Sequence, residues 1–571
     1  MKKTLSIIMA LCMILSVCFF SVSAAEAKVG SVAADYVPEG TAITDAAGFA
    51  AMAADGKYYL ANDITLDATW NAGAAVSSTY KENTAFTGTL DGNGKTITTS
   101  APLFANLQGT VKNLTVTGAI DAATLNCGVI TMWTNGTITV ENVLNKATIT
   151  NGTTVGGILG YGATGTVATF TNCQNDANLA AASHLGGIAG YIQDDSVVIT
   201  NCVNNGNLTT DNYGAGIIGR FGRDKASAPD SIATITGCVN NGKVVSTKGQ
   251  SGGILGYLVG KTVITDCVNY GEIVNKALSS GGILGATGKT ADTCSITIDN
   301  CVNYGKIVAP GIAGGIGGRV GRASTLATEH YFISNCVNYG EIEVIAPQDF
   351  ADVIYVGGIA GYVYGGSANG ITNCVNAGNI TVDSTVGAHK YDYYVAGILG
   401  YVNSSTFECK NNINAGFITT KGEFNAVCLT VYNKNVEAAA TLNNYSVTIE
   451  GIAVAYTGDP AASTFVEATA FATATSSNKI ESGEVAYLIN EAAGATIYYQ
   501  AIGTDKVPVL EAAADGSNVV EKKADGTFAN PVKEEPKPVD PVPTGDSALI
   551  FAVIAVISVL GVAVVAKRRE N

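Results

Sequence analysis

Short alternating runs of apolar and polar residues, punctuated by asparagine and glycine, cover most of this chain. In KTVITDCVNYGEIV (261–274), Val, Ile and Thr alternate with polar residues, and Asn and Gly follow where the chain must turn. Period-two alternation predicts half-buried strands, and Asn and Gly favour the positive φ of tight corners. The pattern therefore predicts many short β-strands joined at sharp corners.

This pattern repeats along the chain in two blocks. The first block is a short stretch of glycines and apolar residues, and the second, which follows it, is exemplified by TDCVNYGE (265–272). The first block occurs as GGILGY (156–161), GGIAGY (186–191), AGIIGR (215–220), GGILGY (252–257), GGILGA (281–286), GGIGGR (314–319), GGIAGY (357–362) and AGILGY (396–401). A unit of about 30 residues cannot bury its apolar face alone, whereas stacked copies can. We therefore predict an all-β solenoid, a parallel β-helix, over residues 81–424.

The same repeat explains a stretch that resembles a phosphate-binding loop. GGILGATGKT (281–290) ends like G-x-x-x-x-G-K-[ST], but the residue five before Gly288 is Ile283 rather than glycine. The stretch is the fifth copy of the first block. We therefore interpret its glycines as part of the repeat, not as a nucleotide site.

Eleven cysteines remain once Cys12 and Cys18 are removed with a signal peptide. Seven of them occupy one repeat position: Cys173, Cys202, Cys238, Cys267, Cys301, Cys336 and Cys374. Equivalent residues of stacked rungs lie about 4.8 Å apart with parallel Cβ vectors, which is too wide for a disulfide. We expect small buried apolar side chains; metal binding is the alternative, but no C-x-x-C spacing supports it.

Irregular segments flank the predicted coil. In TDAAGFAAMAA (44–54), Thr44 is a candidate N-cap of a short helix within an N-terminal capping region, residues 26–80. In SGEVAYLINEA (482–492), Ser482 is a candidate N-cap of a second helix. Residues 425–515 are therefore an irregular C-terminal capping region or a small separate domain.

Both chain ends carry targeting patterns. Residues 1–25 have two lysines, an apolar run and small residues, as in a secretory signal peptide. Residues 516–547 form a proline-rich spacer, 548–566 an uncharged segment of transmembrane length, and 567–571 a basic cytoplasmic tail. The chain is therefore expected to be exported and tethered through its C-terminal helix.

The layout around Thr544 and Gly545 resembles the cell-wall sorting signal of Gram-positive bacteria, in which a sortase cuts L-P-x-T-G between Thr and Gly and joins the Thr to peptidoglycan. The sequence here is P-V-P-T-G (541–545), so its first two positions depart from that pattern. Wall attachment through Thr544 and plain membrane anchoring remain equal alternatives. Both place the chain on the extracellular face of a Gram-positive envelope.

The body of the chain resembles bacterial surface proteins that carry GLUG-type repeats. The likeness covers residues 40–420 and rests on FTGTLDGNGKTIT (86–98), APLFANLQGTVKNLTVTGAI (101–120) and the repeated G-[IL]-x-G blocks. Such proteins are similar to the pectate-lyase-like superfamily, which implies a right-handed coil. The family includes adhesin-like proteins, and its repeats also accompany a protease domain in streptococcal immunoglobulin proteases.

The net charge and the ionisable residues narrow the range of partners and reactions that the chain can have. The net charge of −15 argues against nucleic acid as a partner. The three histidines, His184, His330 and His389, form no H-E-x-x-H motif, and the pair Asp194–Asp195 stands alone. No motif requires a cofactor or metal. We therefore expect no catalytic residue; the alternative is a polysaccharide lyase or glycoside hydrolase with its site on a flank of the coil.

Two sets of residues are candidates for binding. Tyr270, Tyr304 and Tyr339 share one repeat position, and other tyrosines follow the first block at Tyr161, Tyr191, Tyr257, Tyr362 and Tyr401. Facing outward, tyrosines can contact sugars or a protein partner; facing one another, they stabilise the coil. Arg220 and Arg319 replace the block tyrosine, and with Arg223 and Arg322 they could bind carboxylates or sulfates or merely project from loops. The predicted function is adhesion to, or binding of, a host or environmental glycan or surface protein.

Overall fold

The computed structural model describes residues 28–531 apart from internal stretches. These stretches are 67–69, 71–83, 194–195, 224–230, 289–293, 322–329, 348–351, 365–367, 386–392, 404–406, 423–425, 429–430, 434–439, 443, 448–455, 458–465 and 468–472. The predicted signal peptide, Arg322, Thr544, Gly545 and segment 548–566 lie outside the described residues. Within the described part, no helix is long and apolar enough to cross a membrane.

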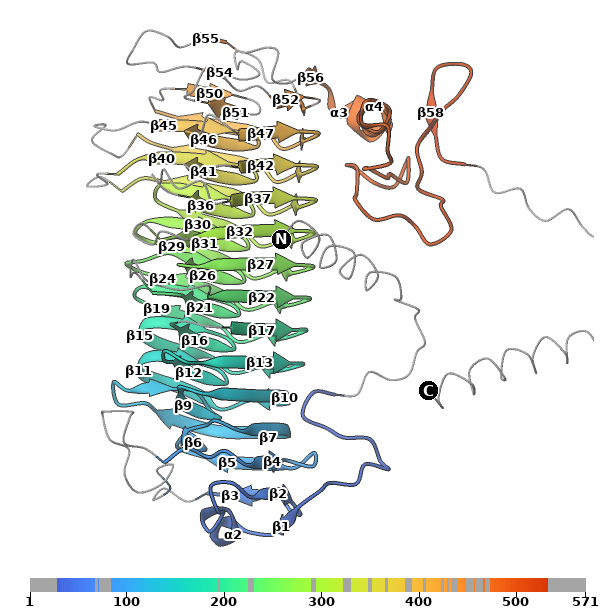
Figure 1. The fold of residues 1–571 in the computed structure, drawn as a ribbon. Helices are drawn as coiled ribbons and strands as arrows, with labels where there is room; N and C mark the ends of the chain where they lie inside the picture. Colours follow the sequence, from blue (N-terminus) through green and yellow to red (C-terminus); the bar gives the residue numbers. More distant parts are fainter. Residues whose placement is uncertain are drawn as a thin grey trace, which may run out of the picture.

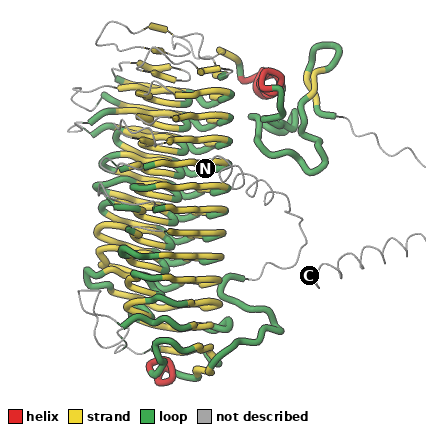
Figure 2. The backbone as a smooth tube through the Cα atoms, viewed as in Figure 1, coloured by secondary structure: helices red, strands yellow, loops and turns green. Residues whose placement is uncertain are grey.

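The chain forms a right-handed parallel β-helix, as the repeat and the resemblance predicted (Figures 1 and 2). Three strand faces run along it, and strands of successive rungs pair in parallel, so that Lys261–Thr265 lies between Ile232–Thr236 and Ser295–Asp299. Equivalent residues of the repeat therefore lie above one another along the whole coil.

The first face consists of strands of three to nine residues, most of them five residues long. From β13 (Val167–Thr171) onward, each is continued by a short strand after a corner of two residues. The longer strands are β10 (Thr137–Asn145), β13 (Val167–Thr171), β17 (Ser196–Thr200), β22 (Ile232–Thr236), β27 (Lys261–Thr265), β32 (Ser295–Asp299), β37 (His330–Ser334), β42 (Ala368–Thr372), β47 (Phe407–Lys410) and β52 (Ala440–Leu442). The short strands are β14 (Gln174–Asn175), β18 (Val203–Asn204), β23 (Val239–Asn240), β28 (Val268–Asn269), β33 (Val302–Asn303), β38 (Val337–Asn338), β43 (Val375–Asn376), β48 (Ile413–Asn414) and β53 (Tyr445–Val447).

The second and third faces meet at the Gly-Gly-Ile of the first block. The second face contains β11 (Thr148–Gly156), β15 (Leu179–Gly186), β19 (Leu208–Thr210), β20 (Tyr213–Ala215), β24 (Val244–Ser246), β25 (Ser251–Gly252), β29 (Ile273–Asn275), β30 (Ser279–Gly281), β34 (Ile307–Ala309), β35 (Ile312–Gly314), β39 (Ile342–Ile345), β40 (Ile354–Gly357), β44 (Ile380–Asp383), β45 (Tyr393–Ala396), β49 (Ile418–Lys421) and β50 (Ala426–Cys428). The third contains β6 (Phe104–Asn106), β9 (Thr131–Thr134), β12 (Leu159–Gly162), β16 (Ala189–Ile192), β21 (Ile218–Phe221), β26 (Leu255–Leu258), β31 (Leu284–Thr287), β36 (Gly317–Gly321), β41 (Ala360–Tyr364), β46 (Leu399–Asn403), β51 (Val431–Asn433), β54 (Tyr456–Thr457) and β55 (Val466–Glu467).

Residues in left-handed conformation make the corners of the first face, one inside β10 and the others before the short strands from β14 to β48. Their φ angles lie between 51° and 64°, and they are Asn142, Asn172, Asn201, Gly237, Asp266, Asn300, Asn335, Asn373 and Asn411. Asn, Asp and Gly tolerate this conformation best. The predicted use of Asn and Gly at corners is therefore confirmed.

The residues that follow these corners fill the inside of the coil. All eleven cysteines are free and buried, as expected for small apolar side chains. Burial raises the pKa of the Cys202, Cys301 and Cys336 thiols well above the ordinary value. The cysteine row therefore packs the core, and these three thiols stay protonated there.

A row of buried asparagines, which the sequence analysis missed, runs beside the cysteines. Each side-chain amide donates to the next rung's side-chain oxygen, as from Asn269 to Asn303 (2.7 Å) and from Asn303 to Asn338 (2.8 Å). The same amide nitrogen also donates to the carbonyl two residues on, as from Asn303 to Gly305 (2.9 Å). The row extends from Asn145 through Asn175, Asn204, Asn240, Asn269, Asn303, Asn338 and Asn376 to Asn414. Each corner is thus tied to its neighbours inside the coil.

The N-terminal end contains a short helix, α2 (Ala46–Ala50), as predicted. Its N-cap is Asp45 rather than Thr44, because the Asp45 carboxylate accepts from the Gly48 amide (2.8 Å). The neighbouring strands are β1 (Thr41–Ile43), β2 (Lys57–Leu60), β3 (Ile64–Thr65), β4 (Thr89–Asp91), β5 (Thr96–Thr99), β7 (Thr110–Asp121) and β8 (Asn126–Cys127).

A C-terminal module lies against the side of the upper rungs (Figure 1). It contains β56 (Thr473–Thr475), α3 (Ser477–Glu481), α4 (Glu484–Ala493), β57 (Glu521–Lys522) and β58 (Phe528–Ala529). The predicted N-cap Ser482 is instead the C-cap of α3, which begins after Ser476, and α4 starts after Gly483. The buried Tyr498 hydroxyl donates to the Asn411 carbonyl (2.8 Å) and so attaches the module to the coil.

Candidate functional site

The first candidate surface is the stack of Tyr270, Tyr304 and Tyr339. Neighbouring ring centroids are 4.9 and 5.0 Å apart, and the ring planes differ by 4° and 7°. Tyr270 is 54% exposed and Tyr304 47% exposed, whereas Tyr339 is partly buried beside the C-terminal module. Burial raises the pKa of Tyr339 to about 12. The structure therefore combines the two alternatives left open by the sequence: the rings stack on one another, and two of them also face outward.

The backbone fixes this row. The amide N–H groups of Tyr304 and Tyr339 donate to the Asn269 and Asn303 carbonyls, both at 2.7 Å. Each tyrosine thus repeats the orientation of the previous one at the spacing of the rungs. A stack held in this way is a rigid aromatic surface.

The same repeat position carries other residues outside the stack. On the N-terminal side Asn205 donates to Asp176 (2.7 Å) and Asn241 donates to Asn205 (2.8 Å). On the C-terminal side the position is alanine, at Ala377 and Ala415, and both alanines pack against the module. The exposed stack therefore lies between an amide row and the module.

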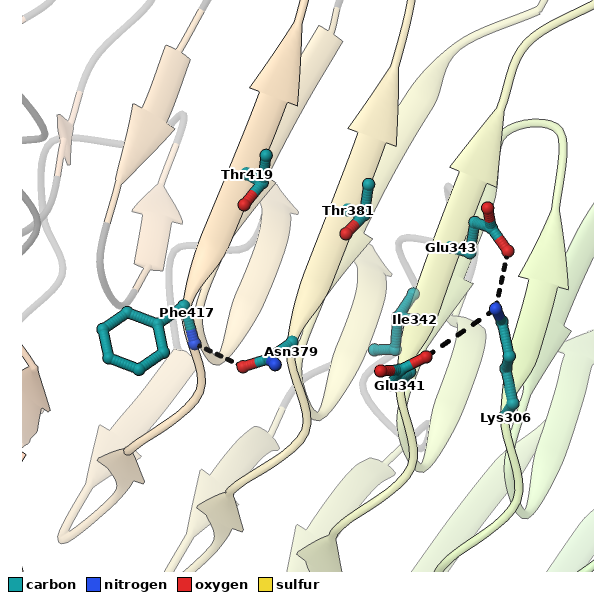
Figure 3. Close-up of a pocket in the computed structure, with 8 residues that line it drawn as sticks. All are labelled: Lys306, Glu341, Ile342, Glu343, Asn379, Thr381, Phe417 and Thr419. Atoms are coloured by element: carbon teal, nitrogen blue, oxygen red, sulfur yellow. Dashed lines mark hydrogen bonds and ion pairs between the residues drawn. The ribbon is translucent and has the colours of Figure 1, made fainter.

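A row of charged residues lies two positions further along on four successive rungs, at Lys243, Glu272, Lys306 and Glu341. Lys243 pairs with Glu272 (2.7 Å), and Lys306 pairs with Glu341 (3.7 Å) and Glu343 (2.8 Å). Figure 3 shows this end of the row, where Lys306 points between the two carboxylates at a groove of about 250 Å³. Phe417, 53% exposed, borders the other end of that groove. The charges are mutually compensated and exposed, so each pair contributes at most about 1 kcal/mol to stability.

The second candidate surface is a seam on the outside of the coil, where the second face turns into the third. There, each outward residue of the second face meets the outward residue of the third face that comes seven positions later in the sequence. The spacing is the same at every rung because the Gly-Gly-Ile corner between them has constant length. His184 and Tyr191 have ring centroids 4.7 Å apart, and Tyr355 and Tyr362 5.3 Å. The pairs, in rung order, are 184/191, 213/220, 250/257, 279/286, 312/319, 355/362 and 394/401. Sequence analysis recognised one half of this seam, the block tyrosines and arginines, but not the residues opposite.

Arg220 lies in the aromatic part of the seam. Its guanidinium carbon is 4.9 Å from the ring centre of Tyr191, 5.5 Å from that of Tyr213 and 5.2 Å from that of Tyr257. Its Nε donates to the Gly222 carbonyl (3.2 Å). Burial, together with the Arg220 charge, lowers the pKa of His184 to about 3. Arg220 is thus the charged member of an aromatic cluster whose histidine stays neutral.

Arg319 occupies the equivalent position three rungs later, as the register through Tyr257 and Ala286 shows. It is half-buried, and its Nη2 donates to the Thr287 carbonyl (3.1 Å). The two arginines therefore share one register position, three rungs apart. Arg223 is half-buried and follows β21, outside the seam pairs, so the structure does not place it with Arg220 and Arg319.

The block tyrosines themselves are mostly covered. Tyr191, Tyr257 and Tyr401 are buried, and Tyr161 and Tyr362 are half-buried. Aromatic contacts of this kind stabilise the coil by packing. No group of three or more His, Cys, Asp or Glu side chains among the described residues could hold a metal ion.

Comparisons with known proteins add little. No protein-family model matches the chain, and no curated protein matches it. The crystal structure of a putative immunoglobulin A1 protease from Bacteroides ovatus is similar with 15% identity, 83% of this chain and 94% of that chain covered, and a TM-score of 0.26. A likeness with so low a TM-score carries no argument, so the fold rests on the strand pairing alone.

Proposed function

We propose that the chain is a surface-tethered, non-catalytic β-helix protein that binds a glycan or a protein of the host or environment. The exposed tyrosine stack, with Tyr270 and Tyr304 about half exposed on a rigid coil, carries this proposal. Aromatic side chains held rigidly on a surface lose little conformational entropy on binding and are frequent binding hot spots. The resemblance to adhesin-like proteins with GLUG-type repeats supports the same function.

The tether belongs to the proposal. Residues 1–25 direct export, and residues 548–566 anchor the chain in the membrane of a Gram-positive cell. A sortase joins Thr544 to peptidoglycan, or the apolar segment alone retains the chain. Cell fractionation separates the two: protein released only by wall-digesting enzymes, and retained in the membrane after Thr544→Ala, supports covalent attachment. Release by detergent alone leaves the membrane anchor.

Binding is tested with the purified full chain in detergent on arrays of glycans and mucins. Tyr270→Ala and Tyr304→Ala remove the exposed rings. Each is expected to weaken binding by 1–2 kcal/mol, about five- to thirty-fold, as for an aromatic hot spot. Asn205→Ala and Asn241→Ala are the matched controls, because they occupy the same repeat position outside the stack.

Three results would be decisive. Saturable binding that the tyrosine variants weaken and the asparagine variants retain supports the proposal. Equal binding by all variants contradicts the assignment of the site to the stack. A parallel polysaccharide-degradation screen that releases product would instead establish the enzyme alternative, a lyase or glycoside hydrolase.

A further inference from the structure

The groove of about 250 Å³ on the second face has small polar side chains in its middle and large side chains at its two ends (Figure 3). Asn379, Thr381 and Thr419 lie in the middle, on two successive rungs, and all three are exposed. Phe417, 53% exposed, borders one end, and Lys306 with its two glutamates borders the other. The groove is therefore open to solvent, and a ligand from outside can reach the side chains that line it.

The backbone sets the direction of the Asn379 side chain. Its side-chain oxygen accepts from the amide N–H of Phe417 on the next rung (3.0 Å). The oxygen is thereby directed at the backbone, which leaves the NH2 group as the part that can donate to a ligand. Asn207 occupies the same repeat position on an earlier rung, and its oxygen accepts from the Lys243 amide N–H at the same distance (3.0 Å). The bond to the backbone is thus a feature of the repeat, whereas of these two asparagines only Asn379 lines the groove.

The charged end of the groove combines one cation with two anions. The Nζ of Lys306 lies 2.8 Å from a carboxylate oxygen of Glu343 and 3.7 Å from one of Glu341. The hydrogen bond to Glu343 is the main cause that raises the pKa of Lys306, so the ammonium stays charged. A carboxylate only accepts hydrogen bonds and an ammonium only donates them. This end therefore offers acceptors and a donor side by side.

Charge and hydrogen-bonding capacity select the class of ligand. Two carboxylates against one ammonium make the groove net negative, so an acidic ligand is repelled. A basic side chain of a protein would meet the ammonium of Lys306 and would leave the hydroxyls and the amide of the groove unused. A peptide cannot add as a strand in the middle either, because β44 is paired on both sides there. The hydroxyls of a neutral sugar can donate to the carboxylates and accept from the ammonium and the amide, and its apolar face can pack on an exposed aromatic ring.

We infer that this groove binds a sugar unit of a neutral glycan. Phe417 packs against the apolar face of the sugar ring, and the Asn379 amide and the Lys306–Glu343 pair hydrogen-bond its hydroxyls. The tyrosine stack adjoins the groove, because Tyr304 and Lys306 are two residues apart and their Cα atoms are therefore at most about 7 Å apart. A glycan that contacts the stack can thus extend into the groove. The inference rests on the proposed function, to which it adds the class of glycan and a second contact surface.

The test is a binding titration of the purified full chain in detergent. The probes are neutral oligosaccharides of glucose, galactose, mannose and N-acetylglucosamine, a uronic-acid oligosaccharide, and a lysine-rich peptide. At least one neutral oligosaccharide should bind saturably and more tightly than the uronic-acid oligosaccharide and the peptide. Phe417→Ala, which removes the ring at the end of the groove, should weaken that binding at least about fivefold. Ile345→Ala is its control, because Ile345 is a 48% exposed apolar residue of β39 that does not line the groove.

A matched pair of asparagine variants separates binding from structure. Asn379→Ala and Asn207→Ala each remove one side-chain oxygen that accepts a backbone N–H at 3.0 Å, so their melting temperatures should fall by comparable amounts. Asn379→Ala should also weaken binding of the neutral oligosaccharide several-fold, whereas Asn207→Ala should bind as the wild type does. If both variants weaken binding equally, or neither does, the assignment of the sugar to the groove is wrong.

The outcomes also separate this inference from the assignment of binding to the tyrosine stack. Neutral-glycan binding that is lost in Phe417→Ala but retained in Tyr270→Ala and Tyr304→Ala supports the inference, even though the stack assignment then fails. Losses in both sets of variants support both. Binding that depends only on the tyrosines overturns the inference and leaves the proposed function intact. Tighter binding of the uronic-acid oligosaccharide or of the lysine-rich peptide, or no binding of any neutral oligosaccharide, overturns it as well.

Discussion

The row of buried asparagines provides the sharpest stability prediction. Replacing Asn303 by alanine removes a side chain that accepts from Asn269 (2.7 Å) and donates to Asn338 (2.8 Å) and Gly305 (2.9 Å). Three buried polar groups then lose a partner: the Asn269 amide, the Asn338 side-chain oxygen and the Gly305 carbonyl. Asn303 and Asn338 are fully buried, so water cannot replace these contacts without entering the coil.

The expected cost follows from this count. A buried polar group without a partner costs about 1–3 kcal/mol, so three of them cost roughly 3–6 kcal/mol after local relaxation. Asn205→Ala is the matched control, because Asn205 makes similar amide contacts on the exposed outer row. There water replaces the lost partners, and we expect a loss below about 1 kcal/mol.

The assay must resolve rungs, because a solenoid can unfold locally rather than in one step. Hydrogen exchange of the full chain, read on peptides covering residues 261–274 and 295–309, measures the local free energy of opening. A urea titration followed by circular dichroism measures the whole coil. If Asn303→Ala and Asn205→Ala lose the same stability, the row is not a major source of stability and the reasoning is wrong.

Four further predictions follow from other parts of the molecule. Gly282→Ala should cost at least 1–3 kcal/mol in a urea titration, because its Cβ would lie 2.2 Å from the Gly315 carbonyl oxygen; Gly48→Ala, with no contact under 3.5 Å, should cost far less. The native chain should show no thiol from the coil reacting with an aromatic disulfide reagent until it unfolds, because all eleven cysteines are buried. His184 has a pKa of about 3 when folded, below the ordinary value of 6.5, so its contribution to stability is complete above pH 6.5 and is lost as the pH falls toward 3; His184→Gln should remove that part of the acid dependence of the melting temperature. Ala377→Tyr should place a fourth ring where Ala377 now packs against the C-terminal module, which should displace the module and increase proteolysis after residue 475. Asn241→Tyr, on the other side of the stack, should leave the module protected.

Much of the coil could be read from the sequence because its determinants are local. Alternation along Lys261–Thr265 gives a strand, and Asp266 in left-handed conformation gives a corner. The buried asparagines could also have been found, because Asn269 follows Cys267 by two residues and therefore points to the same side of the strand. The predicted cysteine row thus already contained the signal for the asparagine row.

Local sequence patterns could not predict the seam or the docking of the C-terminal module. That His184 contacts Tyr191 depends on the constant corner between two faces and on side chains that meet outside the coil. The docking of α3 and α4 depends on contacts such as Tyr498 with Asn411, which lie 87 residues apart in the sequence. Nothing within either segment indicates the other, so sequence analysis left residues 425–515 as a cap or a separate domain.

One repeat position nevertheless joins these results. Along it the chain carries Asp176 and the amides of Asn205 and Asn241, then the three tyrosines, then Ala377 and Ala415. The backbone is the same at every rung, so only the side chain changes. Large rings leave an exposed stack, whereas alanine allows another part of the chain to approach closely. A solenoid can therefore divide one flank into a polar, an aromatic and a docking zone by single substitutions, without altering its core.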